Sequence, residues 1–175
     1  MDDPTFWTLI DESRSLCDGD DAVARAESQA EHLTALLKKR SAYEIEAFER
    51  RFTELMNASF TWDLWGAAFI INGGCDEEGF EFFRAWLIGQ GRDVYDRAMK
   101  DPQSLLELVK AEPEPSEVLF EAEPLIFAAG DAYIARTSED IDVPMPMRAA
   151  EPKGRAWDEA ELPSRFPALW AYFEA

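Results

Sequence analysis

Apolar residues recur every three to four positions along most of the chain, the spacing that places them on one face of an α-helix. The first long stripe consists of Val23, Ala26, Ala30, Leu33 and Leu37. The second consists of Ile45, Phe48, Phe52 and Leu55. Because no segment alternates between apolar and polar residues as a half-buried strand does, the pattern predicts an all-α fold. We expect a single compact domain of about seven to nine helices.

Capping residues stand where several of these helices should begin. Asp3 and Pro4 mark the first start, since proline suits the first helical position. Asp21 precedes the first stripe, and Ser41 with Glu44 matches the capping box that opens a helix. We expect the helices after Asp21 and Ser41 to form a helical hairpin, with a single kinked rod as the alternative.

The most apolar part of the chain, residues 62–95, is predicted to lie at the centre of the core. Thr61 and Asp76 are suited to cap two helices, and the sequence Asn72-Gly73-Gly74 separates these helices with a turn. Both helices are apolar on nearly all faces, which is typical of buried helices. The side chains expected to be buried in mutual contact are Trp65, Phe69, Phe80, Phe83, Trp86 and Leu87.

A further helix is predicted after the proline-rich sequence of residues 111–115. Ser116 is suited to cap it, and apolar residues at helical spacing continue to Tyr133. Pro124 interrupts this pattern, because proline inside a helix removes a backbone hydrogen bond and clashes with the preceding turn. We therefore expect either a kinked helix or two abutting helices.

Helical periodicity stops at Thr137, and the prolines between there and Gly154 predict an irregular, extended strap. This divides the chain into a helical domain, residues 1–136, and an irregular C-terminal segment, residues 137–175. The C-terminal segment is expected to pack back on the helices, because its large apolar side chains would otherwise form an aggregation-prone patch. These side chains are Phe166, Trp170 and Phe173.

The net charge of the chain limits the classes of molecule that it is expected to bind. The chain has 175 residues, and 17 Lys and Arg against 36 Asp and Glu give a net charge of −19. Contacts to phosphate require Lys and Arg, so the balance argues against nucleic acid and anionic membranes and favours a basic protein partner. No apolar run approaches the ~20 residues of a membrane span. The acidic start of the chain does not resemble a signal peptide, so we expect a cytoplasmic protein.

The side chains that usually carry catalysis are sparse. His32 is the single histidine, which leaves little basis for a histidine-based triad or a histidine-rich metal site. The sequence therefore indicates no metal and no cofactor. We expect a protein without enzymatic activity, although the sequence does not decide this.

The central segment contains the candidate polar site. Asp76, Glu77 and Glu78 either hold a hard cation or simply cap a helix and match its dipole. Arg84 lies among apolar residues, and a buried guanidinium needs a partner. We expect a carboxylate of the same domain to pair with it. The alternative is that Arg84 lines a pocket for an anionic ligand, together with Arg92.

Three motifs in the first half of the chain carry a family resemblance. They are Phe6-Trp7-x-Leu9-Ile10, Asn72-Gly73-Gly74-Cys75 and Phe80-x-x-Phe83-Arg84-x-Trp86-Leu87-Ile88. Through them most of residues 1–136 resembles the bacterial family called domain of unknown function 4240. The resemblance implies a helical domain, and it brings no activity, cofactor or catalytic residue. Where the family pattern has Ser-Asp-Asp after the cysteine, this chain has Asp76-Glu77-Glu78.

Two hypotheses for function remain after these observations. The first is a non-enzymatic interaction domain that binds a basic protein, in the manner of an antitoxin or immunity protein. The alternative is a small-molecule-binding protein or enzyme with a pocket near Arg84 and the turn at residues 72–78. The oligomeric state does not follow from the sequence.

Overall fold

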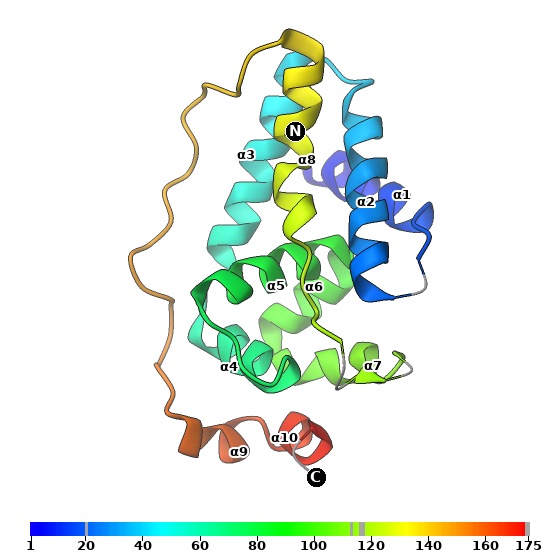
Figure 1. Ribbon diagram of the computed structural model, residues 1–175. Helices are drawn as coiled ribbons and strands as arrows, with labels where there is room; N and C mark the ends of the chain where they lie inside the picture. Colours follow the sequence, from blue (N-terminus) through cyan, green and yellow to red (C-terminus); the bar gives the residue numbers. More distant parts are fainter. Residues whose placement is uncertain (20, 113, 116–117, 174–175) are drawn as a thin grey trace.

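The computed structural model describes residues 1–19, 21–112, 114–115 and 118–173, and these residues form an all-α fold (Figure 1). The first five helices are α1 (Asp3–Ser15), α2 (Ala22–Leu37), α3 (Ala42–Ala58), α4 (Trp62–Ile71) and α5 (Glu77–Gly89). The others are α6 (Arg92–Lys100), α7 (Leu105–Val109), α8 (Glu123–Thr137), α9 (Leu162–Arg165) and α10 (Pro167–Phe173). Two short 3₁₀ helices are η1 (Pro102–Ser104) and η3 (Glu159–Glu161). The all-α prediction is confirmed for the described residues, with slightly more helices than expected because residues 162–173 form two short ones.

Four predicted caps begin their helices as the sequence indicates, namely Asp21, Ser41, Thr61 and Asp76, whereas α1 is capped by Asp2 and not by Asp3. Asp21 accepts a hydrogen bond from the backbone N–H of Ala24 at 2.8 Å, and Asp76 accepts one from Gly79 at 2.8 Å. At α3 both hydrogen bonds of the capping box form between Ser41 and Glu44. Each cap satisfies a backbone donor that the first turn of a helix leaves free.

Helix α8 lies at the centre of the upper layer of the molecule (Figure 1). It packs between α2 and α3 and also contacts α5. Helices α2 and α3 are joined by a short turn and run in opposite directions, as predicted, but α8 fills the space between them. The Thr34 side chain on α2 donates a hydrogen bond to the Ala128 carbonyl on α8 at 3.3 Å.

The start of α8 differs from the prediction. Residues 118–122 are not helical, and the helix begins only at Glu123, with Pro124 in its first turn. Proline fits that position because the first helical N–H groups have no partner within the helix. Pro124 therefore opens the helix instead of kinking it, and Ser116, the predicted cap, lies outside the described residues.

Helices α4 and α5 contribute much of the core, as predicted, but not with all the expected side chains. Phe80, Phe83 and Leu87 are fully buried and Trp86 is nearly so. Trp65 and Phe69, which were expected in the buried group, are only partly buried. Phe69 projects from α4 towards the C-terminal segment, where the Phe69 and Trp157 rings lie 5.2 Å apart, whereas the Trp65 ring stacks on Phe80 at 5.1 Å. Residues far apart in sequence therefore complete the burial of α4.

The C-terminal segment passes along one side of the molecule and ends beneath α4 (Figure 1). Its start is held by α3, because Arg50 donates to the Pro144 carbonyl at 2.7 Å and Asn57 donates to the Pro146 carbonyl at 3.0 Å. Its last helices, α9 and α10, pack against one another, and α10 contacts α4. Within them Leu162 and Leu169 are fully buried.

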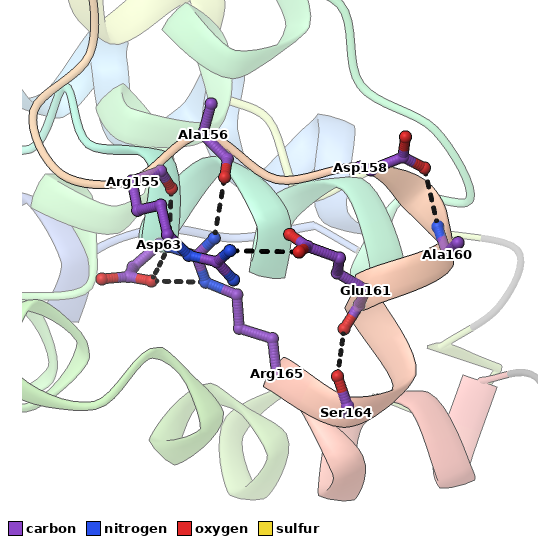
Figure 2. A network of polar contacts seen from close by, with 8 residues as sticks. All are labelled: Asp63, Arg155, Ala156, Asp158, Ala160, Glu161, Ser164 and Arg165. Carbon is purple, nitrogen blue, oxygen red and sulfur yellow. Dashed lines mark hydrogen bonds and ion pairs between the residues drawn. The ribbon is translucent and has the colours of Figure 1, made fainter.

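A polar network fastens this segment to α4 (Figure 2). Arg165 donates to one carboxylate oxygen of Asp63 from Nε at 2.9 Å and from Nη2 at 2.6 Å. The same guanidinium donates to the backbone carbonyls of Arg155 at 2.8 Å and Ala156 at 3.4 Å. Arg155 in turn pairs with Glu161 at 3.0 Å. One arginine thus joins α9, the extended part of the segment and α4.

Candidate functional site

Arg84 is buried on α5 with only 1% of its surface exposed. Its Nη1 donates to the Met56 carbonyl at the end of α3 at 2.7 Å, and its Nε donates to the Phe80 carbonyl at 3.2 Å. The guanidinium also lies over two aromatic rings, 5.0 Å from the centroid of Phe60 and 4.9 Å from that of Phe80. Carbonyl oxygens and aromatic faces therefore stabilise this cation in the protein interior.

The expected carboxylate partner of Arg84 is not found: no acidic side chain among the described residues forms an ion pair with it. The prediction of burial was correct and the prediction of a salt bridge was wrong. The end of α3 explains the difference, because the last carbonyl groups of a helix lack helical partners and one of them, that of Met56, accepts a hydrogen bond from the arginine. Burial lowers the pKa of Arg84 to about 10, which leaves the side chain charged at neutral pH.

The C-terminal segment covers Arg84 from outside. Arg148 lies over the Phe60 ring, 4.5 Å from its centroid, and pairs with Glu77 at 2.6 Å. Neither Arg84 nor residues 72–78 line any of the five main cavities in the described part of the chain. The geometry thus assigns Arg84 a structural role, linking α5 to the end of α3.

The three acidic residues after Cys75 have separate partners. Asp76 caps α5, Glu77 pairs with Arg148, and Glu78 is exposed to solvent. Over the residues that can be described, no group of three or more His, Cys, Asp or Glu side chains is arranged to hold a metal ion. The Cys75 thiol stays protonated, since burial and the nearby carboxylates of Glu121 and Asp76 raise its pKa to about 12.

Arg92 does not join Arg84. It lies exposed at the start of α6 and approaches Asp96 at 3.4 Å, one helical turn away. Arg92 borders a shallow groove of about 480 Å³ next to α1, whereas Arg84 lies inside the protein against α3. The candidate residues Asp76, Glu77, Glu78, Arg84 and Arg92 therefore do not form one site.

A larger groove, of about 560 Å³, runs between α2 and α8. Four carboxylates line it: Glu27, Glu31, Glu123 and Asp131. Between them lies Phe127, whose side chain is 54% exposed. None of these four carboxylates forms an ion pair with a described residue, and all four residues are exposed to solvent.

Helices α2 and α8, which form this groove, run parallel to one another, so both begin at the same end of it (Figure 1). Glu27 and Glu31 are one turn apart on α2. Asp131 lies one turn beyond Phe127 on α8. The groove ends at Lys38, whose backbone carbonyl accepts a hydrogen bond from Arg136 at 3.5 Å. The acidic part therefore occupies one end and the middle of the groove, and the basic part occupies the other end.

The sequence did not identify this groove. The residues that meet across it are separated by about 100 positions in the sequence. Acidic residues at helical spacing usually form a solvated helix face. Phe127 was a usable signal, because it is a large apolar residue that falls outside the helical spacing of Ile126, Ala129 and Tyr133. Phe127 could be assigned to a groove only once the packing of α8 against α2 was known.

Within the described residues, no helix is long and apolar enough to cross a membrane.

The fold and the groove define a compact, strongly acidic helical domain that presents an uncovered surface between two helices. The chain belongs to the family described as Protein of unknown function (DUF4240), whose family model matches residues 1–135. No curated protein and no solved structure matches the chain. The family match ends within α8, so the C-terminal segment that covers α4 lies beyond it.

Proposed function

We propose that this protein is a cytoplasmic, non-enzymatic domain that binds a basic protein partner. The observation that carries the proposal is the α2–α8 groove, where four carboxylates that form no ion pair with a described residue surround an exposed phenylalanine. One form of this function is an antitoxin or immunity protein, which neutralises its target by covering a basic surface. The net charge of −19 favours a basic protein as partner and disfavours nucleic acid, whose phosphates are also negatively charged.

The groove has the two components that protein interfaces combine. Phe127 offers an aromatic anchor, and residues of this type carry much of the binding energy in many interfaces. The carboxylates of Glu27, Glu31 and Asp131 surround it and attract positive charge. Charge complementarity of this kind increases the association rate and excludes partners of the wrong sign. A basic segment with an apolar side chain at its centre therefore fits the groove.

Affinity capture with groove variants tests this function. The full chain is used as bait in the native organism. The proteins that it binds are compared with those bound by a Glu31→Lys/Asp131→Lys variant. We expect a basic protein to be captured by the wild type, lost from the groove variant and released at high salt, because exposed ion pairs are screened. Phe127→Ala should reduce capture without a change in charge.

The control variant is Glu12→Lys/Glu159→Lys, which makes the same change in net charge at two exposed positions outside the groove. If this control loses the partner as completely as the groove variant does, net charge rather than the groove determines binding. If the wild type captures no basic protein, the proposed function is wrong.

A further inference from the structure

The α2–α8 groove is lined by helices, and this limits the form of the segment that it can bind. All its lining residues belong to α2 or α8 or, in the case of Lys38, directly follow α2. An extended segment bound here finds no strand edge, so its buried backbone groups would lack hydrogen-bond partners. A bound α-helix bonds its own N–H and C=O groups internally and meets the groove with side chains only.

Exposed apolar side chains extend the groove along both helices. Ile134 lies two turns beyond Phe127 on α8, and 46% of its surface is exposed. Val23 lies one turn before Glu27 on α2 and is exposed as well. At 1.5 Å per residue, Phe127 and Ile134 are about 10 Å apart along α8. Apolar residues seven positions apart on a partner helix have the same spacing, which is typical of a helix bound in a groove.

The charges of the groove give it a direction. Glu27 and Glu123 lie towards the starts of α2 and α8, whereas Lys38 and Arg136 lie at the ends of these helices. Because α2 and α8 are parallel, acidic residues occupy one end of the groove and basic residues the other (Figure 1). Neither Lys38 nor Arg136 forms an ion pair with a residue that the structure describes. A helix that is basic at one end and acidic at the other therefore complements the groove in one orientation only.

On the basis of the function proposed above, we infer that the groove binds one amphipathic α-helix of the basic partner, antiparallel to α2 and α8. The apolar face of this helix contacts Phe127 and Ile134, and its Lys and Arg side chains meet Glu27 and Glu123. Basic residues suit the last turn of a helix and acidic residues its first turn, because of the helix dipole. The C-terminal end of the bound helix therefore lies at the starts of α2 and α8.

Synthetic peptides added to the full chain test this binding mode without the natural partner. The probe is a peptide of about 18 residues, long enough to form a helix. It has Glu in its first turn, Leu at helical spacing in its middle and Lys in its last two turns. A second peptide has proline in place of one glutamine on the polar face, which breaks the helix without a change in charge. We expect the probe to bind saturably by fluorescence anisotropy, and the proline peptide to bind at least about ten-fold more weakly.

A nitroxide label on the C-terminal residue of the probe reports the direction of the bound helix. In the NMR spectrum of the protein, the label broadens the signals of backbone amides that lie near it. We expect stronger broadening at Glu27 than at Lys38, because the Lys-rich end of the probe lies at the acidic end of the groove.

Variants of the protein locate the site. Glu31→Lys/Asp131→Lys should weaken binding of the probe about ten-fold or more, since it reverses two charges in the groove. The control Glu12→Lys/Glu159→Lys should weaken binding by no more than about two-fold, because only long-range attraction is reduced. Equal losses in the two variants would show that the probe does not occupy the groove.

The bound helix is also ruled out if the probe does not bind, if the proline peptide binds as well as the probe, or if broadening is strongest at Lys38. Any of these results, together with capture of a basic protein through the groove, would leave the proposed function in place and overturn the helix alone. Failure to capture any basic protein contradicts the proposed function instead, and this is measured without the peptides.

Discussion

The ring of Phe166 lies against the backbone of Gly66, so close that a Cβ atom on this glycine would meet the ring at 2.6 Å. The contact joins the C-terminal segment to α4 at a point where no larger residue fits. Phe166 is 3% exposed and Gly66 is buried. A glycine in the middle of a helix costs about 1 kcal/mol relative to alanine, and close packing of Phe166 explains why it stands here.

Gly66→Ala should therefore lower the free energy of unfolding by about 1–3 kcal/mol, the usual cost of overpacking, less the gain in helix propensity. The measurement is chemical denaturation of single and double variants. In a Phe166→Ala background the added methyl group has room, so the same substitution should become neutral or stabilising. Equal effects of Gly66→Ala in both backgrounds would contradict this contact.

Deletion of residues 157–175 should lower the melting temperature by at least about 5 °C, since it removes several buried apolar side chains. It also uncovers the partly buried side chains of Trp62 and Phe69, against which Trp157 packs, and this should promote self-association. Thermal melts and light scattering measure the two effects. Asp63→Ala is the control: it breaks only the ion pair with Arg165, in which Asp63 is 56% exposed, and should cost less than about 1 kcal/mol. A truncated chain that melts like the wild type and remains monodisperse would show that the segment does not stabilise the domain.

Phe83→Ala should cost about 3–5 kcal/mol, the transfer and cavity terms for a large core side chain. Phe83 is fully buried on α5 and lies 5.3 Å from Trp86 between ring centroids. Phe127→Ala makes the same substitution at a phenylalanine that is 54% exposed, and it should change stability far less. Both variants are compared with the wild type by urea denaturation. Equal losses of unfolding free energy would contradict the placement of Phe83 in the core.

Much of the fold was predictable because its signals are local. Ser41 and Glu44 form their capping box within three residues, and Asp21 caps α2 through the nearby Ala24. Such contacts depend on neighbouring residues alone, so the sequence displays them directly. The apolar stripes behave in the same way, with the exception of Val23, which is 60% exposed in the first turn of α2.

The features that were not predicted depend on contacts between distant segments. Arg84 meets the Met56 carbonyl, 28 positions away, and no pattern in the sequence shows that the end of α3 lies against α5. The groove joins Glu31 to Asp131 only because α8 packs between α2 and α3. Local periodicity indicates which face of a helix is buried, but not which helix covers it.

Arg84→Met should change the free energy of unfolding by less than about 2 kcal/mol, because a buried charge replaced by an apolar side chain of similar length is often tolerated. No carboxylate among the described residues would be left unpaired by this change. Arg84→Ala should cost more, about 2–5 kcal/mol, since it leaves a cavity between Phe60 and Phe80. A loss for Arg84→Met as large as that for Arg84→Ala would indicate that the hydrogen bonds to Met56 and Phe80 dominate over packing.

Glu49 on α3 predicts a pH dependence of stability. Burial raises the pKa of Glu49 to about 7 from an ordinary value of 4.5, and a hydrogen bond with Thr53 opposes only part of this effect. Because the folded-state pKa is the higher one, the folded protein binds this proton more tightly than the unfolded chain does. The stabilisation is complete below the unfolded pKa and is lost as the pH rises through the folded pKa.

Glu49→Gln removes this titration while keeping the shape of the side chain. The difference in unfolding free energy between the variant and the wild type should therefore grow in favour of the variant between about pH 4.5 and pH 7, by at most roughly 3 kcal/mol. Urea denaturation at several pH values measures it. Glu12→Gln, the same substitution at an exposed position of α1, should leave the pH dependence of the wild type in place. A difference for Glu49→Gln that stays constant from pH 4 to pH 8 would mean that Glu49 is not desolvated in the folded protein.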